Sequence, residues 1–327
     1  MATEAENRHC EQLNRSGHLK HLLTLEGLDR EILNMLLDRA ESYLRPAGEP
    51  PARDQALAGR TVANLFFEAS TRTRASFELA AKRMSADVLN LDVNTSSRKK
   101  GESILDTIYT LQAMQADVFV VRDASAGIPA MIAASVQPHV SVLNAGESSV
   151  SHPTQGLLDI MTIRQHKPDF EKLAIAIVGD VAHSRVARSV TQALRIMGTR
   201  DIRLVSPPGL DPDPGLYPGA SITSDLNAGL AGADVVMALR IQRERIEQQA
   251  TLISAADYHE AYGINDARLL RAKPDAIVMH PGPMNRDVEI SSQVADGPRS
   301  VITRQVTNGL AMRMAILATV VEARRHR

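Results

Sequence analysis

From Thr61 onward, short aliphatic runs alternate with longer stretches in which apolar residues recur at helical spacing. Strands are predicted at TVANLFF, ADVLNLD, ADVFVVR, VSVLNAG, LAIAIVGD, DIRLVSP, ADVVMALR and DAIVMHP, and the last helix at QVTNGLAMRMAILATVVEARR. Strands so rich in Val, Ile and Leu are typical of parallel sheets covered by helices. The sequence therefore predicts an α/β fold with two parallel β-sheets, each flanked by helices. A helical pattern also covers residues 21–44, and KPDF at 167–170 indicates a break after a linking helix.

The overall charge excludes several classes of function. Lys and Arg total 37 against 38 for Asp and Glu, which gives no electrostatic reason to expect a nucleic-acid or membrane binder.

The single cysteine, Cys10, excludes an internal disulfide framework and a cysteine-based zinc site. We expect no metal and no cofactor. No apolar run resembles a signal peptide or membrane span, so a cytoplasmic location is expected.

Polar residues stand where most of the predicted strands end. In open parallel sheets, ligands bind beyond the carboxyl ends of the strands. These positions hold Ser70, Thr71, Arg72, Thr73 and Arg74 after LFF, Arg122 after VFVV, His152 and Gln155 after VSVLNAG, Arg185 after LAIAIVGD, Arg240 and Gln242 after VVMAL, and His280, Pro281, Gly282 and Pro283 after AIVM. Recurrent cations in a chain of balanced charge predict a local site for a small, multiply anionic ligand.

The stretch STRTR begins a helix directly after a strand. A helix N-terminus presents unpaired N–H groups and the positive end of the helix dipole, which favour phosphate. Three hydroxyl groups add donors, and the guanidinium of Arg72 is a forked donor suited to phosphate oxygens. Alone, such a cluster is equally typical of a capped helix start, with Arg74 pairing with Glu78 one turn on.

The other strand-end residues also have simple structural interpretations. Alone, Arg122 fits a strand-end arginine in water, and His152 fits a buried histidine with satisfied hydrogen bonds. SSRKKGES fits a solvated turn, and HPGP a rigid turn in which the Gly-Pro bond can be cis. The functional interpretation rests on their coincidence at one sheet edge.

The stretch IVGDVAHSRVARS has the strand–glycine–helix order of a dinucleotide site but lacks G-x-G-x-x-G. Gly179 is its only glycine, and the helix begins at Ser184-Arg185. An arginine at that position fits a carboxylate better than a pyrophosphate, so a nicotinamide enzyme is disfavoured.

Taken together, the motifs resemble a known family. STRTR after an apolar strand, then KKGE, an arginine, HPTQ and HPGP, resembles the aspartate/ornithine carbamoyltransferases, from Leu22 to the last helix. HPTQGLLD and HPGPMNR favour the aspartate carbamoyltransferase catalytic chains, and the ornithine branch is disfavoured because the HPGP segment has no cysteine. The resemblance implies transfer of a carbamoyl group from carbamoyl phosphate to L-aspartate, giving N-carbamoyl-L-aspartate and phosphate, in pyrimidine biosynthesis.

The resemblance also implies the domains and their residues. Residues 1–152 plus 306–327 would bind carbamoyl phosphate, with the C-terminal helix packing back on this N-terminal domain, and residues 153–305 would bind aspartate. For the phosphate it implies Ser70, Thr71, Arg72 and Thr73. For the carbamoyl group it implies Thr73, Arg122 and His152 at the carbonyl oxygen, and Gln155 with the backbone carbonyls of Gly282 and Pro283 at the amide. For the aspartate carboxylates it implies Arg185 and Arg240, with Gln242 beside them.

The family's catalytic unit is a homotrimer, and the resemblance implies that Lys100, with Ser96, reaches a neighbouring subunit's site. A larger assembly with a regulatory or dihydroorotase-like chain is a further implication. No residue has the pattern of an activated nucleophile, so direct attack by the amine is expected, with Arg72, Thr73, Arg122 and His152 as the catalytic residues. Two alternatives stay open: a carbamoyltransferase for another amine, and a non-catalytic family member, which the retained motif residues disfavour.

Several positions depart from the family pattern. Asp123 stands where His is common, and Glu147-Ser148 replaces a frequent Asp-Gly. Ser85 and Asp287 stand where Gly is usual. None of these is a substrate-contacting position in the motif match, but Asp287 brings a negative charge and a less permissive backbone close to HPGP.

Overall fold

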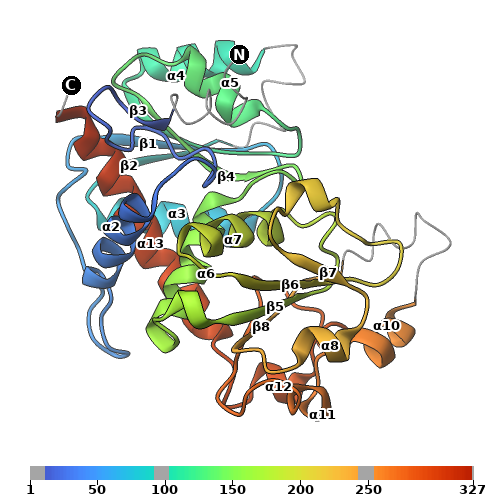
Figure 1. Cartoon of the computed structure of the whole chain (residues 1–327). Helices are drawn as coiled ribbons and strands as arrows, with labels where there is room; N and C mark the ends of the chain where they lie inside the picture. Colours follow the sequence, from blue (N-terminus) through green and yellow to red (C-terminus); the bar gives the residue numbers. More distant parts are fainter. Residues whose placement is uncertain (1–11, 92–102, 242–253, 326–327) are drawn as a thin grey trace. The chain divides into compact units, whose positions relative to one another are not determined.

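The computed structural model describes residues 12–91, 103–241 and 254–325. The chain divides into a first unit, Met1–Leu157 with Thr307–Arg327, and a second unit, Leu158–Val306. Each unit contains one parallel sheet with helices on its faces (Figure 1). The predicted α/β fold with two parallel sheets is therefore confirmed.

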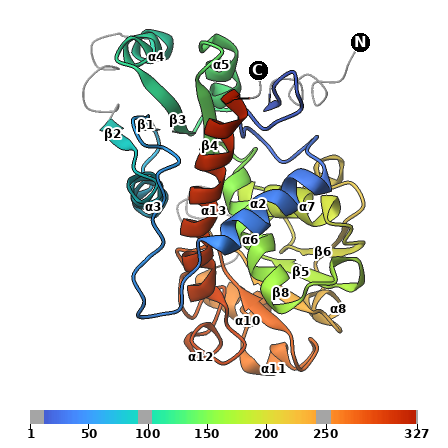
Figure 2. The same cartoon turned by 90° about the vertical axis from the view of Figure 1, so that its left-hand side faces the viewer.

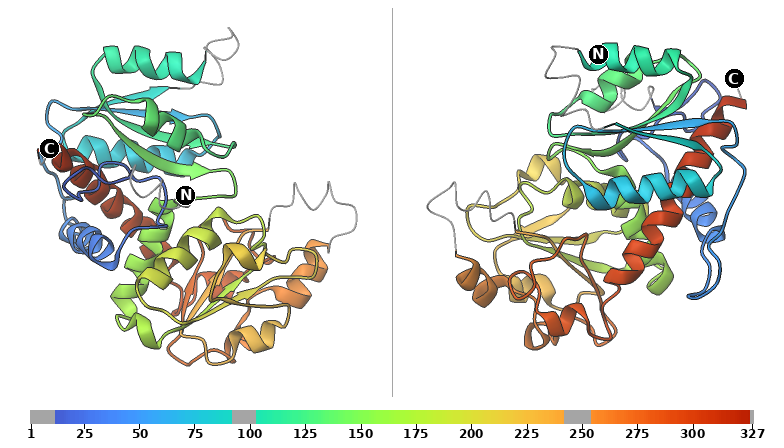
Figure 3. Two further views of the ribbon diagram at one scale, coloured as in Figure 1. Left: turned by 45° about the horizontal axis from the view of Figure 1, so that its top comes forward. Right: turned by 180° about the vertical axis from the view of Figure 1, so that it is seen from behind.

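The first unit is built on a four-stranded sheet in the order β2-β1-β3-β4. Helix α3 covers one face of this sheet, and α4 and α5 cover the other (Figure 3). The elements of this unit are α2 (Arg30–Ser42), β1 (Thr61–Phe66), α3 (Thr71–Arg83), β2 (Asp87–Leu91), α4 (Ile104–Ala113), β3 (Ala116–Asp123), α5 (Ile128–Ser135) and β4 (Ser141–Glu147). All residues of β3 and β4 are buried, as expected for strands covered on both faces.

The second unit is built on a five-stranded sheet in the order β7-β6-β5-β8-β9, in which every pairing is parallel. Its strands are β5 (Ala174–Val178), β6 (Asp201–Val205), β7 (Ser221–Thr223), β8 (Val235–Ala238) and β9 (Ile277–Met279). Its helices are α7 (Arg185–Ile196), α8 (Leu226–Leu230), α10 (Ala255–Tyr262), α11 (Asp266–Leu269) and α12 (Ser292–Ala295), with short 3₁₀ turns η2 (Phe170–Lys172) and η3 (Pro214–Leu216). The short strand β7 was not predicted from the sequence.

Two helices contain a boundary between the units: α6 (Pro153–His166) and α13 (Ile302–Glu322), which continues into the 3₁₀ turn η4 (Ala323–Arg325). Most of α13 belongs to the first unit (Figure 2). There Glu322 accepts two hydrogen bonds from Arg39 at 2.5 and 2.6 Å, and the guanidinium of Arg313 lies 5.1 Å from the centre of the Phe77 ring. The predicted packing of the C-terminal helix on the N-terminal domain is confirmed.

The helix predicted over residues 21–44 begins only at Arg30. Asp29 caps it by accepting a hydrogen bond from the Ile32 N–H at 2.8 Å. Gly27, with φ of 82°, separates this helix from Leu22, which forms a parallel bridge with Leu143 of β4. Edge pairing to the sheet thus overrides the helical spacing of the leucines in this stretch.

Three positions where the family resemblance suggests glycine adopt left-handed backbone conformations. Ser85, Ser148 and Asp287 have φ of 66°, 45° and 59°. The left-handed region costs a residue with a Cβ about 1–2 kcal/mol, whereas glycine enters it freely. The Asp287 carboxylate accepts hydrogen bonds from the N–H and the hydroxyl of Ser292 at 2.9 and 3.2 Å, which offsets part of that cost.

Replacing Asp287 by Gly and by Ala separates backbone strain from these hydrogen bonds. Both variants lose the carboxylate, but only the Ala variant keeps the strained conformation. We therefore expect the Gly variant to melt about 2–4 °C above the Ala variant, corresponding to about 1 kcal/mol. Thermal unfolding followed by circular dichroism measures the difference, and an Ala variant at least as stable as Gly would contradict the left-handed conformation.

Candidate active site

The predicted phosphate and carbamoyl residues of the first unit lie at the carboxyl edge of its sheet. Strands β1, β3 and β4 are neighbours, so their carboxyl ends lie side by side. In the register of β1 and β3, Arg122 is opposite Phe66, and the Phe67 N–H donates to the Arg122 carbonyl at 2.8 Å. The STRTR segment, Arg122 and His152 therefore lie at or after the carboxyl ends of three adjacent strands, as the sequence predicted.

The N-terminus of α3 has no side-chain cap. Ser70 occupies the N-cap position, but its side chain accepts no capping hydrogen bond. In α7, by contrast, the N-cap Ser184 accepts from the Ala187 N–H at 3.1 Å. The first-turn N–H groups of α3 thus lack the N-cap side-chain acceptor that α7 has, and such groups bind phosphate. Arg72 is exposed beside them, and Thr73 is buried.

The exposed Arg74 lies in the same helical turn, and the sequence predicted that it pairs with Glu78. Glu78 accepts a hydrogen bond from Nζ of Lys82 at 2.6 Å. This bond is the main reason that the pKa of Glu78 lies below its ordinary value, and the charge of Arg74 is a smaller cause.

Arg122 is buried and is held by two acceptors. Its guanidinium donates to Glu68 at 2.7 Å and to the Ala145 carbonyl at 3.3 Å. The sequence analysis missed Glu68, although it is the one acidic residue in the basic stretch FFEASTRTR. A half-buried carboxylate beside a buried guanidinium fixes the position of that cation.

His152 and Gln155 are positioned by a tight connection after β4. Glu147 and Ser151 form an antiparallel bridge, and α6 follows directly. His152 is buried, its Nδ1 lies 3.4 Å from the Thr154 hydroxyl, and its carbonyl accepts from the Gln155 N–H at 2.9 Å.

Two of the departures from the family pattern stabilise these connections. The Glu147 carboxylate accepts from the Asn144 amide at 2.9 Å and from the Gly127 N–H at 2.5 Å. Asp123 is buried and accepts from the Ser125 N–H at 2.7 Å. Both carboxylates therefore accept from backbone N–H groups of the connection between β3 and α5, and Glu147 is also held by Asn144 within β4.

The predicted aspartate residues of the second unit lie at the carboxyl edge of its own sheet. Strands β5, β8 and β9 are neighbours, and Arg185, Arg240 and His280 follow them in that order. A Cβ atom at Gly179 would lie 2.9 Å from the Leu239 carbonyl oxygen, so glycine is needed where the chain passes closely before Arg240. Arg185 and Arg240 are both half-buried.

The HPGP segment is held by a buried network of hydrogen bonds. The Gly282–Pro283 peptide bond is cis, as the sequence allowed. Nδ1 of His280 accepts from the Gly282 N–H at 2.8 Å, so its proton is on Nε2, which donates to Glu289 at 3.1 Å. The side chains of His280 and Glu289 are fully buried.

Glu289 and Gln305 extend this network to three other segments. Glu289 accepts from the N–H and the amide of Asn285, at 2.5 and 3.2 Å, and the Asn285 amide also donates to the Ile241 carbonyl, next to Arg240. Gln305 of α13 accepts from the His280 N–H and donates to Asp159 of α6, both at 2.9 Å. Through Glu289 and Asn285, the turn after β9 is linked to the segment after β8.

The negative charge of Glu289 also acts on a neighbouring phenol. Burial raises the pKa of Tyr258, and the charge of Glu289 raises it further.

Three predicted site residues, Ser96, Lys100 and Gln242, lie outside the described residues. Within the described ranges, no cluster of three His, Cys, Asp or Glu side chains is arranged to hold a metal ion. No helix in the described part of the chain is long and apolar enough to cross a membrane.

Comparison with known proteins identifies the family. A family model for the carbamoyl-P binding domain of aspartate/ornithine carbamoyltransferases matches residues 20–165, and one for their Asp/Orn binding domain matches residues 171–320. The chain belongs to the aspartate/ornithine carbamoyltransferase family. The strand-end residues of both units fall within the matched ranges.

Solved structures of both branches are similar to this carbamoyltransferase chain. Aspartate transcarbamoylase from Trypanosoma cruzi in complex with carbamoyl phosphate is 33% identical over 92% of this chain and 96% of that chain, with a TM-score of 0.82. The same enzyme in complex with N-(phosphonacetyl)-L-aspartic acid is 32% identical over 94% and 98%, with a TM-score of 0.81. Ornithine carbamoyltransferase from Thermus thermophilus is 26% identical over 92% and 99%, with a TM-score of 0.81.

The buried network around Glu289 makes a testable prediction. In Glu289→Gln, one of the donors now facing the carboxylate meets an amide N–H₂ and loses its acceptor. A buried donor left unsatisfied costs about 1–3 kcal/mol, so we expect a loss of stability of that size. Chemical denaturation measures it, with the exposed Glu260→Gln as a matched control that should unfold like the unmodified chain. Equal stability of the two variants would show that the network is not held together by this carboxylate.

Proposed function

We propose that this carbamoyltransferase transfers the carbamoyl group of carbamoyl phosphate to the amine of L-aspartate, giving N-carbamoyl-L-aspartate and phosphate. The observation that carries the proposal is the separation of cations between the two sheets. One sheet edge carries a helix N-terminus with Arg72 and the buried Arg122, and the other carries two arginines that follow neighbouring strands. The first set suits a phosphate with an adjacent carbonyl, and the second suits a pair of carboxylates.

In the first unit, we assign the phosphate to Ser70, Thr71, Arg72 and Thr73. The first-turn N–H groups of α3 and the Arg72 guanidinium supply donors in several directions, as a tetrahedral anion requires. We assign the carbamoyl carbonyl oxygen to Thr73, Arg122 and His152, and the carbamoyl NH₂ to Gln155 and the carbonyls of Gly282 and Pro283. The phosphate and the carbonyl oxygen thereby fall to residues 1–152 plus 306–327, our proposed carbamoyl-phosphate-binding domain. Residues 153–305, our proposed aspartate-binding domain, also supply the three contacts to the carbamoyl NH₂.

In the proposed reaction, the aspartate amine attacks the carbamoyl carbon directly. The new C–N bond places negative charge on the carbonyl oxygen, which Arg122, His152 and Thr73 stabilise. The C–O bond to phosphate then breaks, the leaving phosphate keeps the electron pair, and its oxygens accept the proton released by the amine. Alignment of two bound reactants supplies about 7–11 kcal/mol. Each oriented donor to the oxyanion contributes about 2.7–4 kcal/mol.

Aspartate is favoured over ornithine by the charges of the second unit. Arg185 and Arg240 present two guanidinium groups after neighbouring strands, which match the two carboxylates of aspartate. Ornithine has one carboxylate, and its side-chain ammonium would be repelled by the second arginine. Gln242 is assigned to the acceptor site beside them. We assign Ser96 and Lys100 to a neighbouring subunit's site in a homotrimer, and the reaction to pyrimidine biosynthesis.

A product assay with the purified chain tests the proposed acceptor. We expect aspartate to be carbamoylated at least about 100-fold more efficiently than ornithine, because a mismatched charge in a site built for a carboxylate is strongly rejected. Colorimetric detection of the carbamoyl products, with the mass of the chain in solution measured alongside, gives the result. Faster formation of citrulline from ornithine, or no product from either amine, would contradict the proposed acceptor or the proposed activity, respectively.

The role of Arg122 is tested by its effect on turnover. In Arg122→Ala, kcat should fall about 10²–10³-fold, because a donor to the transition-state oxyanion is lost, while the KM for carbamoyl phosphate changes much less. Arg74→Ala, which removes an exposed arginine of the same sheet edge, should leave kcat near normal. Near-normal turnover in Arg122→Ala, or a change confined to KM, would show that Arg122 serves binding or structure only. Thermal unfolding of both variants checks that the fold is retained.

A further inference from the structure

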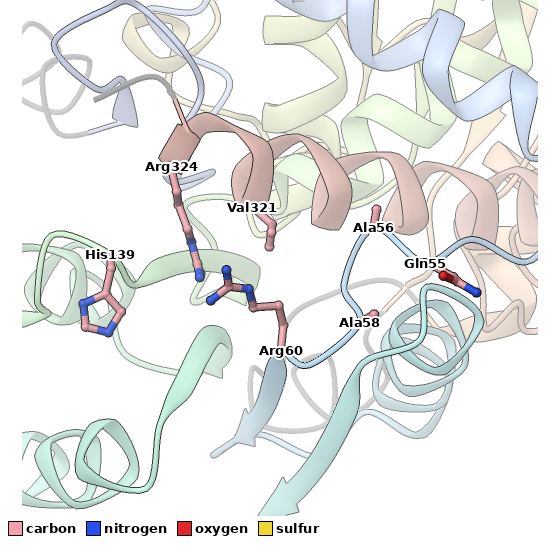
Figure 4. A pocket seen from close by; sticks show the side chains of 7 residues that line it. All are labelled: Gln55, Ala56, Ala58, Arg60, His139, Val321 and Arg324. Atoms are coloured by element: carbon pink, nitrogen blue, oxygen red, sulfur yellow. The ribbon is translucent and has the colours of Figure 1, made fainter.

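A cluster of hydrogen bonds in each unit joins segments that are far apart in the sequence. In the first unit, Asp117 accepts from Arg60 and Arg324 at 3.2 and 2.7 Å, beside a cavity of about 330 Å³ (Figure 4). Arg60 precedes β1, so this cluster lies at the opposite edge of the sheet from the STRTR segment. In the second unit, Asn285 and Glu289 join the turn after β9 to the segment after β8. Both of these segments carry proposed substrate residues, so the second cluster is placed to act on the site.

The backbone around Arg240 is held on both sides of that residue. Before it, the Leu239 N–H donates to the Val178 carbonyl at 2.8 Å, which extends the pairing of β8 with β5. After it, the Ile241 carbonyl accepts from the Asn285 amide at 3.2 Å, and the Ile241 side chain is buried in the core of the second unit. The place from which the Arg240 side chain extends is thus set by two anchors, one from β5 and one from Asn285.

Glu289 fixes the orientation of the Asn285 amide. The fully buried carboxylate of Glu289 accepts from the Asn285 backbone N–H at 2.5 Å and from the Asn285 amide at 3.2 Å. Both neighbours of this amide, the carboxylate and the Ile241 carbonyl, are acceptors, so its NH₂ group must face them. With one amide hydrogen on Glu289, the other is directed at Ile241. The hydrogen bond to Ile241 therefore requires an amide at position 285.

The same carboxylate holds the HPGP turn through contacts that do not involve the Asn285 side chain. Nε2 of His280 donates to Glu289 at 3.1 Å, and Nδ1 of His280 accepts from the Gly282 N–H at 2.8 Å. The bond from the Asn285 backbone N–H to Glu289 also remains when the side chain is shortened. Loss of the Asn285 amide should therefore release the segment after β8 while the turn after β9 stays in place.

We propose that Asn285 is a positioning residue for the amine acceptor. By holding the Ile241 carbonyl, it sets Arg240 where the guanidinium meets a carboxylate of the acceptor. The inference rests on the proposed function, in which Arg240 binds aspartate, and adds a residue that acts through Arg240. Because Asn285 acts on the acceptor and not on the carbonyl carbon, its loss should raise the KM for aspartate more than it lowers kcat.

Steady-state kinetics of Asn285→Ala tests this proposal. We expect the KM for aspartate to rise about tenfold, because a small misplacement of a binding group is costly, while kcat and the KM for carbamoyl phosphate change less than about threefold. Two variants of the second unit are the controls. Asn227→Ala removes an exposed asparagine of α8, and Asp225→Ala removes the N-cap of the same helix. Both should keep the KM for aspartate, although Asp225→Ala loses stability.

A double-mutant cycle separates positioning of Arg240 from a general structural role. If Asn285 acts through Arg240, adding Asn285→Ala to Arg240→Ala should lower kcat/KM for aspartate no further, so the two effects are not additive. Thermal unfolding of each variant checks the fold. If Asn285→Ala is unstable, Asn285→Ser decides, because a hydroxyl has one donor and cannot serve both Glu289 and Ile241. Additive effects, or an unchanged KM for aspartate, would overturn the inference.

The unmodified chain separates this inference from the proposed function. No product from the unmodified chain with any amine would overturn the proposed function and the inference together. Product from aspartate, with a KM that Asn285→Ala does not change, would overturn the inference alone. If another amine is the better acceptor, the proposed acceptor is wrong, and the same cycle with that amine decides the role of Asn285.

Discussion

Parallel strand pairing is the constraint on which the placement of the site residues depends. Because every strand pairing in both sheets is parallel, all the strands of a sheet end at the same edge. Ser70 and His152, about 80 positions apart in the sequence, therefore both lie beyond the same edge of one sheet. The same geometry leaves an opposite edge with different residues, and there Arg60 and Arg324 meet at Asp117.

The sequence was sufficient to predict the two sheets, most of their strands and the edges at which the cations lie, because buried parallel strands have a distinctive aliphatic pattern. It could not predict contacts that depend on packing between distant segments. The pairing of Leu22 with β4 is set by an open sheet edge and not by helical spacing. Glu68 was missed because nothing in its local sequence shows that Arg122 lies opposite, and the linkage of His280 to Asp159 through Gln305 joins segments more than 100 residues apart.

The departures from the family pattern are accounted for mainly by local structure. Ser85, Ser148 and Asp287 keep left-handed conformations that glycine would adopt without strain, and Asp287 directs its carboxylate to Ser292. Glu147 and Asp123 accept hydrogen bonds from backbone N–H groups of the connection between β3 and α5. The three acidic departures, Asp287, Glu147 and Asp123, therefore place negative charge near the strand ends, and each carboxylate accepts hydrogen bonds from donors within the fold.

The central claim is that the strand-end cations bind carbamoyl phosphate and aspartate. A crystal structure of this chain with N-(phosphonacetyl)-L-aspartic acid, which the similar Trypanosoma cruzi enzyme binds, tests it most directly. The account predicts the phosphonate within hydrogen-bonding distance of Arg72 and the first-turn N–H groups of α3, with the two carboxylates on Arg185 and Arg240. A bound ligand that contacts neither Arg72 nor Arg122, with its carboxylates away from Arg185 and Arg240, would contradict it.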